Sequence, residues 1–211
     1  MSVAGNAAEI ENLVKTALLE MWTGERPLTL SRTVAQERQF ENWWKFEVAA
    51  ALWPVAEKLG CDVWVETPAR TDVSLMPAPG SSTTEGSMRV LFELKTMGTF
   101  WQVENINKAF GEPGKKRLLD DLRECARDTR AARPFGVVGL LLTHQPGGVA
   151  SDPHAFDQFL TAALALPGKH GLASLDLLCE SEIPLPRPGL GLEAGMARQV
   201  FWIRRFSRAG K

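Results

Sequence analysis

The sequence predicts an α/β fold in which a central mixed β-sheet is flanked by helices. Segments with the apolar spacing of helices alternate along the chain with segments that have the spacing of strands. The run FGVVGLLLTH at 135–144 is nearly continuous in apolar residues, which is typical of a strand buried on both faces. The chain has 211 residues and no internal repeat, so we expect one domain over 1–211.

Two helices are predicted before the first strand. The first covers residues 7–22, where apolar residues recur at intervals of three and four, and Pro27 follows its end. The second covers about residues 33–59 and ends at a glycine. Pro54 lies inside it, so we expect a kink or a split at that residue.

Three short strands are predicted next. CDVWVE at 61–66 alternates apolar and polar residues, and TDVSL at 71–75 is the second strand. A segment rich in Pro, Gly and Ser at 77–87 is expected to be a loop. MRVLFELK at 88–95 is the third strand.

The second half of the chain continues the alternation. The segment 115–133 is highly charged but keeps apolar residues near one side, which indicates a surface helix. The buried strand described above follows it. A further helix is expected over 154–166, and later strands over 172–180 and 198–206.

Two charged residues interrupt the third strand. Glu93 and Lys95 are two apart, so on a strand they project from the same face. Burying two such ions costs several kcal/mol each unless they are paired or bound. A hairpin of the second and third strands would set Asp72 beside Glu93. Because two adjacent carboxylates repel, a cation between them, such as Mg²⁺, would stabilise the arrangement.

Lys95 adds a chemical role to this arrangement. Lys95 could position or deprotonate an attacking water, or its charge could stabilise the charge that develops on a phosphate. Two carboxylates that hold a metal, with a lysine beside them, suit metal-assisted hydrolysis of a phosphodiester.

The order of these residues resembles the PD-(D/E)xK, or restriction-endonuclease-like, superfamily of nucleases. The matching positions are Glu47 on a helix, Asp72 on a strand, and Glu93 and Lys95 in the Glu-x-Lys of the next strand. The resemblance implies that Asp72 and Glu93 hold Mg²⁺, for which Mn²⁺ can substitute, and that Lys95 assists the water. Glu47 would then be a further metal ligand from the helix.

The resemblance spans about residues 40–145, including the charged helix and the apolar strand after Glu-x-Lys. The first helix and the last strands would be additions to this core. Thr71 stands before Asp72 where the superfamily pattern has proline. Glu41 is the rival to Glu47 for the helix position; Glu47 is preferred because aromatic and apolar residues surround it on the helical wheel.

The expected substrate is DNA, cut as by an endonuclease, with RNA not excluded. The formal net charge is −1, so any phosphate-binding surface must be local. The best candidates follow the Glu-x-Lys strand: Lys108, Lys115, Lys116 and Arg117. A homodimer is compatible with this function, since cutting both strands of a duplex usually requires two sites.

Composition argues against several other classes. The three cysteines are isolated from one another, which disfavours a zinc site or a disulfide framework and favours a reducing, cytoplasmic location. No apolar run approaches 18 residues, so no membrane span is expected. No Gly-x-x-x-x-Gly-Lys loop of the P-loop NTPases occurs.

Two alternatives to the enzyme stay open. The chain could be a catalytically inactive member of the same fold that binds nucleic acid or protein as a regulatory module. Alternatively, Glu93 and Lys95 could form a structural ion pair on an edge strand, which contributes little to stability.

Overall fold

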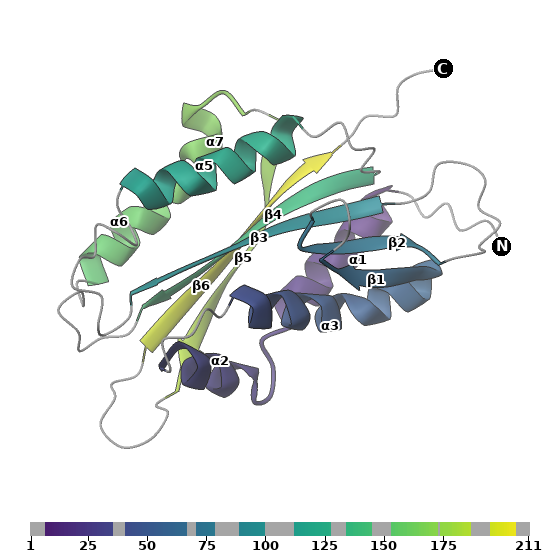
Figure 1. The fold of residues 1–211 in the computed structure, drawn as a ribbon, viewed down its shortest axis with the longest axis horizontal. Coiled ribbons are helices and arrows are strands. Elements are labelled where there is room, and N and C mark those ends of the chain that lie inside the picture. Colours follow the sequence, from purple (N-terminus) through teal and green to yellow (C-terminus); the bar gives the residue numbers. More distant parts are fainter. Residues whose placement is uncertain are drawn as a thin grey trace.

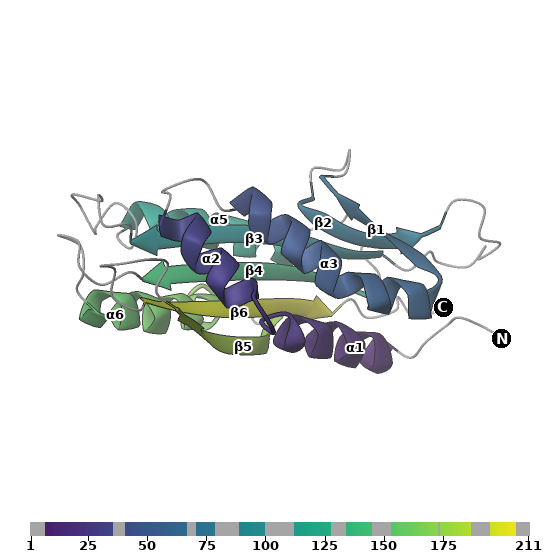
Figure 2. The same ribbon diagram turned by 90° about the horizontal axis from the view of Figure 1, so that it is seen from below.

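The computed structural model describes residues 7–35, 41–66, 71–78, 89–99, 112–127, 134–144, 153–172, 174–186 and 195–205. The strands in these ranges form one sheet with the order β1-β2-β3-β4-β6-β5, and helices lie on both of its faces (Figures 1 and 2). The α/β fold class is therefore confirmed. No helix within these ranges is both long enough and apolar enough to cross a membrane.

The chain runs through the elements in the following order: α1 (Ala7–Glu20), α2 (Arg26–Ala35), α3 (Glu41–Leu59), β1 (Cys61–Val65), β2 (Val73–Pro77), β3 (Arg89–Thr99), α5 (Glu112–Arg127), β4 (Pro134–His144), α6 (Pro153–Leu164), α7 (Leu166–Lys169), β5 (Leu175–Leu185) and β6 (Gly195–Arg205). Strands β3 and β4 are parallel, with α5 in the segment that connects them, whereas the other neighbouring strands are antiparallel.

Helices α1 and α3 cover one face of the sheet (Figures 1 and 2). Helix α3 buries Trp44, Val48 and Leu52 there, and this spacing of four residues places them on one side of the helix. Gln199 of β6 is fully buried beneath the helices; its amide accepts from Trp44 Nε1 (3.2 Å) and donates to the carbonyl of Leu18 (3.1 Å). A buried polar group is thus satisfied by both helices.

Helices α5 and α6 cover the opposite face (Figure 1). Leu118 and Leu122 of α5 pack there with Phe159 of α6 against β4. Strand β4 alternates between the two cores, since Val137 belongs to the first and Val138 to the second. Burial from both faces explains why its sequence is nearly continuous in apolar residues.

Most sequence-based elements are confirmed, with corrections at their ends. The first helix is present as α1, and the second ends before Gly60, whose φ of 63° is the left-handed conformation common after helices. Pro54 does not split that helix, because Glu41–Leu59 is continuous. Strand β5 continues to Leu185, past the end at 180 that the sequence indicated.

Helix α2 was not predicted. Pro27, which the sequence pattern reads as the end of the preceding helix, lies in the first turn of α2, where its missing N–H and fixed φ are tolerated. The helix contacts β5, and the Ser31 hydroxyl donates to the carbonyl of Pro186 at 2.6 Å. The expected start of the second helix at residue 33 is therefore wrong, since α2 occupies Arg26–Ala35 and α3 begins at Glu41.

Candidate active site at the opening of the sheet

The sheet opens between β2 and β3 at Asp72. Ladder pairing of the two strands begins at Val73, which lies opposite Phe92, while β3 continues beyond this point to Thr99. The Asp72 N–H donates to the carbonyl of Phe92 (3.1 Å), so Asp72 lies just before β2, at the end of the ladder and beside Phe92. The expected pairing of Asp72 with Glu93 across two strands stays a prediction, because the printed ladder ends one residue earlier, at Val73.

Two carboxylates accept hydrogen bonds from backbone N–H groups along this part of β3. Asp72 Oδ2 accepts a hydrogen bond from the backbone N–H of Leu94 at 2.6 Å. Two residues further on, Glu41 Oε2 accepts from the N–H of Thr96 at 3.4 Å. Backbone N–H groups at this edge of β3 need hydrogen-bond acceptors, and the carboxylates of Asp72 and Glu41 provide them. The carboxylates of Asp72 and Glu41 therefore lie along the edge of β3 at the opening.

Lys45 of α3 reaches the same opening from the α1–α3 side. Its side chain is 10% exposed, and its Nζ lies 2.9 Å from Asp72 Oδ1 and 3.5 Å from Glu66 Oε1. Burial alone would lower the pKa of the Lys45 ammonium. The hydrogen bond and charge of Asp72, with the nearby charges of Glu41 and Glu66, outweigh burial and raise that pKa above its ordinary value. Lys45 is therefore a charged group in a buried position.

Glu66 has an unusual backbone at this place. Its φ of 54° lies in the left-handed region, which residues other than glycine seldom adopt. Its N–H donates to the carbonyl of Asp72 (2.9 Å), and its side chain contacts Lys45. Strained backbone of this kind costs about 1–3 kcal/mol and persists where surrounding contacts hold it.

Lys95 and Glu93 point to the other face of β3. Phe92 and Leu94 pack in the α1–α3 core, so alternation along the strand directs Glu93, Lys95 and Met97 toward α5. Lys95 Nζ lies 3.4 Å from Asp121 Oδ2 of α5, and both side chains are about 70% buried, with 27% and 30% exposed. Glu93 is half-buried.

Asp121 is an acid whose charge is disfavoured. Burial is the largest influence and raises the pKa of its carboxyl, Lys95 lowers it in part, and the nearby charges of Glu41 and Asp72 raise it further. The carboxyl of Asp121 therefore interacts electrostatically with Glu41 and Asp72 at the opening. The cluster joins α3, β2, β3 and α5.

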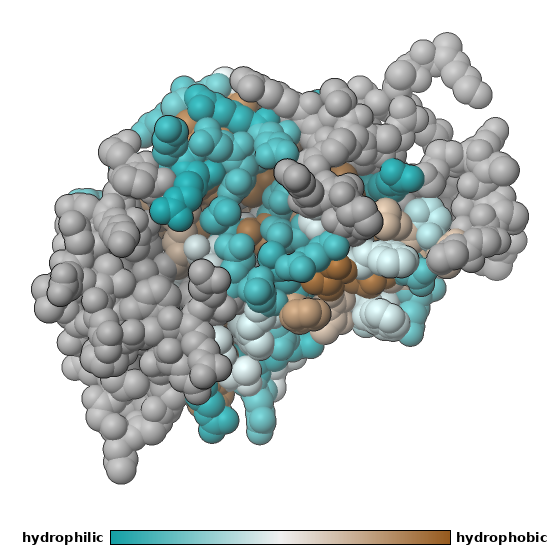
Figure 3. Space-filling model, in the orientation of Figure 1, coloured by the Kyte–Doolittle hydropathy of each residue, from teal (hydrophilic) through white to brown (hydrophobic). Residues whose placement is uncertain are grey.

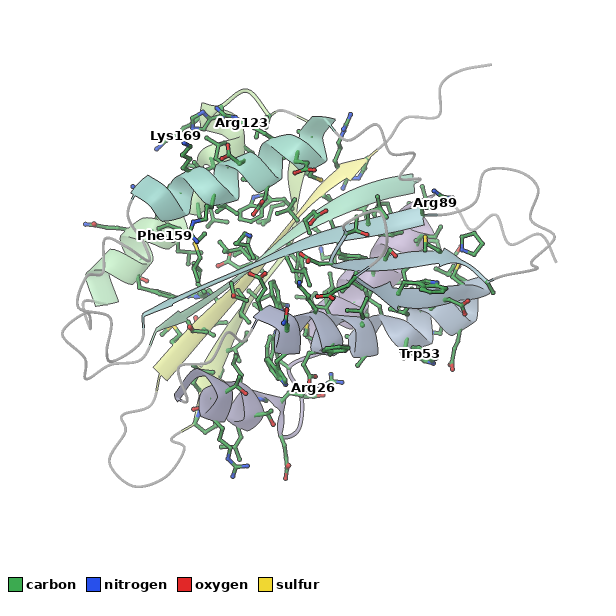
Figure 4. All side chains as sticks on the ribbon, viewed as in Figure 1. Arg26, Trp53, Arg89, Arg123, Phe159 and Lys169 are labelled. Carbon is green, nitrogen blue, oxygen red and sulfur yellow. The ribbon has the colours of Figure 1, made fainter. Side chains whose placement is uncertain are left out.

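Glu47 does not join this cluster. Its carboxylate accepts from Arg26 Nε of α2 at 3.0 Å, and Arg26 lies on the outer side of α3 (Figure 4). Glu41 and Glu47 are six residues apart, about 240° around a helix, so they cannot face the same way. The helix carboxylate that reaches β3 is Glu41, the rival position for the helix acid.

The nucleic-acid candidates lie near the start of α5, with one exception. Lys116 and Arg117 are exposed and Lys115 is half-buried, while Lys108 lies outside the described residues. Arg117 precedes Asp121 by one helical turn, so both are on the same side of α5. Hydrophilic residues cover the outer surface of this helix (Figure 3).

The oxygen atoms near the opening are of the type that a hard divalent cation binds, but they are not gathered into one site, because Asp72 meets Lys45 on the α3 side whereas Glu93 faces α5. Asp72, Glu93 and Glu41 offer only oxygen atoms, which Mg²⁺ prefers, and the two lysines leave an excess of negative charge. In the part of the chain that the structure describes, no three side chains of His, Cys, Asp or Glu form a group that could hold a metal ion. Both Asp72 oxygens are engaged, by Lys45 and by Leu94.

Two members of the cluster, Lys45 and Asp121, were missed in the sequence. Lys45 stands in the apolar run WWKFEVAAAL, and its spacing from the buried Ala49 and Leu52 could have indicated a buried lysine. Asp121 lies between buried leucines of α5, a weaker signal because the helix is charged throughout.

Comparison of the chain with protein-family models, with curated proteins and with solved structures finds no match. The geometry of the sheet opening, together with the sequence, is therefore the basis for the functional proposal.

Proposed function

We propose that the protein is a magnesium-dependent phosphodiester hydrolase that acts on DNA as an endonuclease. One observation supports the proposal: Asp72 lies where the ladder of β2 and β3 ends, beside Phe92, and Glu93 and Lys95 follow Phe92 directly on β3. Acids near one another with a lysine close by can serve metal-assisted hydrolysis of a phosphodiester.

The order of elements also supports the proposal. Helix α3, the three strands β1–β3, helix α5 and strand β4 follow one another in the order that the resemblance to the PD-(D/E)xK superfamily implies. Each of the two layers of helices contributes a charged residue to the opening, Lys45 from α3 and Asp121 from α5. The core of the proposed nuclease covers residues 40–145.

In the proposed mechanism, Asp72 and Glu93 would hold Mg²⁺, or Mn²⁺ in its place, with Glu41 as the helix carboxylate. When bound, the ion supplies positive charge to a phosphate oxygen and to the attacking water. Lys95, as an ammonium, would orient that water through its N–H groups and stabilise the charge that develops on the phosphate. Asp121 keeps the Lys95 ammonium beside Glu93 through the 3.4 Å ion pair.

The surface for the substrate would be the first turns of α5. Lys115, Lys116 and Arg117 lie there and can neutralise phosphates. Arg117, one turn before Asp121, would bring the backbone of a nucleic acid toward Lys95. Lys108 belongs to the same proposed surface by its position in the sequence.

A cleavage assay tests the proposal. Supercoiled plasmid, linear duplex, single-stranded DNA and RNA are incubated with the purified chain and Mg²⁺ or Mn²⁺, with EDTA as the metal-free control. We expect cleavage of DNA that needs the metal and is lost in Asp72→Asn and Lys95→Met. Cleavage that persists undiminished in either variant contradicts the site assignment.

A second candidate function is favoured by a specific contact. Lys45 holds Asp72 Oδ1 at 2.9 Å, which is what an inactive member of the fold, acting as a binding module, would show. Such a protein would bind DNA in an anisotropy titration without cutting any substrate of the panel, and Asp72→Asn would leave that binding unchanged.

A further inference from the structure

Helix α3 is apolar on its outer side as well as on the side that packs on the sheet. Phe46 is 63% exposed and Trp53 is 56% exposed, and Ala50 and Pro54 are exposed with them. Residues 46, 50 and 53 are four and three apart, so they follow one another along one side of the helix. Figure 2 shows no other described element over this side, and Figure 4 shows Trp53 pointing away from the sheet. We call Phe46, Ala50, Trp53 and Pro54 the outer stripe of α3.

The outer stripe is unusual for the surface of a helix. The outward side of a surface helix normally carries charged and polar residues, and a helix that is apolar all round is normally covered on every side. The Trp53 indole N–H donates to Glu57 Oε1 (3.0 Å), so the ring can be covered without leaving its polar atom unsatisfied. The stripe therefore has the properties of a surface that another helix can cover.

The outer stripe is complementary to a second copy of itself. Ala50 is the small residue in the middle, with Phe46 one turn before it and Trp53 one turn after it. Where two copies of α3 cross at Ala50 in opposite directions, the small side chains let the helices approach closely. Phe46 of each copy then lies against Trp53 and Pro54 of the other, and a two-fold axis through the crossing makes the two contacts identical.

The charges at the end of the helix favour this antiparallel arrangement. Glu57 and Lys58 are exposed in the last turn of α3. In an antiparallel pair that crosses at Ala50, these residues lie near Trp43 and Asn42 of the other copy, so no like charges meet. In a parallel pair Glu57 would lie near Glu57 and Lys58 near Lys58, and these contacts are repulsive. The opposed helix dipoles also favour the antiparallel pair.

The size of the outer stripe is that of a weak interface. An aromatic side chain has about 150–250 Å² of surface, so the exposed parts of Phe46 and Trp53 amount to roughly 250 Å² per copy. Two copies would cover roughly 500 Å² of aromatic surface, to which neighbouring side chains add, whereas a stable interface buries about 1,200–2,000 Å². We therefore expect association at micromolar rather than nanomolar concentration.

We propose that the outer stripe of α3 is a dimerisation surface, on which a second copy of the chain packs its own α3 in the opposite direction. Glu41 and Lys45, which reach the opening of the sheet, lie on the inner side of α3, so the contact does not cover them. The dimer would carry two openings, the number that cutting both strands of a duplex requires. Dimerisation by this surface requires neither the proposed activity nor a bound metal.

Sedimentation velocity of the full chain with EDTA, from micromolar to millimolar concentration, tests the proposal. Ala50→Glu places a charge at the crossing and should raise the dissociation constant of the dimer at least about tenfold. Because Ala50 is exposed, this variant should keep the urea midpoint of the wild type. Thr161→Glu is the matched control, at an exposed position of α6 on the opposite face of the sheet, and should dimerise as the wild type does.

Oxidative cross-linking tests the arrangement of the two copies. Ala50→Cys should form a disulfide between them, because the two positions meet at the crossing. Glu57→Cys should not, since in the antiparallel pair the two positions lie roughly 20 Å apart along the helix axes. The wild type, whose Cys61, Cys125 and Cys179 are half-buried or buried, gives the background.

Self-association that Ala50→Glu weakens and Ala50→Cys traps supports the proposal. A chain that stays monomeric at every concentration overturns it, whether a segment of the chain itself or a different protein covers α3. A dimer that Ala50→Glu does not weaken forms through another face and also overturns it. Cross-linking of Glu57→Cys that equals or exceeds that of Ala50→Cys overturns the antiparallel arrangement.

Discussion

The ion pair between Lys45 and Asp72 can be measured by a double-mutant cycle. Asp72→Ala leaves a nearly buried ammonium without its main partner, and loss of one member of a buried pair costs about 3–5 kcal/mol. It also removes the acceptor of the Leu94 N–H, and an unsatisfied buried donor costs about 1–3 kcal/mol. Because Asp72 is 19% exposed and Glu66 stays 3.5 Å from the ammonium, we expect the lower end, a loss of about 3 kcal/mol.

The reverse change removes the charge but leaves Asp72 with one hydrogen bond. In Lys45→Met the carboxylate keeps the N–H of Leu94 and access to water, so the expected loss is about 1–2 kcal/mol. The double variant has no orphaned charge. Its loss should be about 2 kcal/mol below the sum of the two single losses, and this difference is the coupling energy.

Urea unfolding of the four proteins gives the coupling directly. The pair of Arg26 and Glu47 is the matched control, since its side chains are 33% and 22% exposed and its coupling should stay below about 1 kcal/mol. A coupling below about 0.5 kcal/mol for Lys45 and Asp72 would refute the claim that a strong buried pair organises the opening.

Three further expectations concern single residues. Glu41→Gln should lower DNA cleavage at least about tenfold, whereas Glu47→Gln should leave it within about twofold, because only Glu41 reaches β3; equal losses in a rate assay contradict this placement. Asp121→Asn should have a urea midpoint equal to that of the wild type or higher, because burial raises the pKa of the carboxyl more than Lys95 lowers it. A fall of more than about 2 kcal/mol in the free energy of unfolding contradicts this expectation. Burial raises the pKa of the Cys179 thiol to about 11, so alkylation at pH 8 should be about a hundredfold slower in the native protein than in urea; equal rates refute the burial.

The sequence predicts the elements well where one pattern dominates. Strand β4 could be predicted because burial on both faces leaves an apolar run, and α1 because its apolar side is regular. The order of strands in the sheet could not be predicted, since the placement of β6 between β4 and β5 depends on contacts between segments distant in the chain. The C-terminal strands were expected only as additions, and they extend the same sheet beyond β4.

The hairpin of β2 and β3 could be predicted from the sequence, and its ladder ends at Val73 and Phe92, directly before Asp72 and Glu93 are reached. The pairing of Asp72 with Glu93 themselves stays a prediction. The choice of helix acid depended on tertiary packing. Apolar and aromatic residues surround Glu47 on the helical wheel of α3, which favours it from the sequence. Its partner is Arg26 of α2, a helix that the position of Pro27 argues against in the sequence.

The buried charge of Lys45 could not be predicted from the sequence. The spacing of Lys45 from apolar residues can indicate that the residue is buried, but a lysine in an apolar helix usually extends its charge to water, so the pattern does not indicate a buried charge. Its position is explained only when Asp72 and Glu66 are brought beside it by β1 and β2. The same holds for Asp121. It is one of many charged residues of α5, and only its ion pair with Lys95 distinguishes it from the others.

The most direct test of the proposed hydrolase is the rate of cleavage by Glu93→Gln. The substitution removes one negative charge from the opening and keeps the size of the side chain, and Glu9→Gln, at an exposed position of α1, is the matched control. We expect the Mg²⁺-dependent rate on duplex DNA to fall at least about a hundredfold in Glu93→Gln and to stay at the wild-type value in Glu9→Gln. An unchanged rate in Glu93→Gln would contradict the assignment of the metal site to the opening of the sheet.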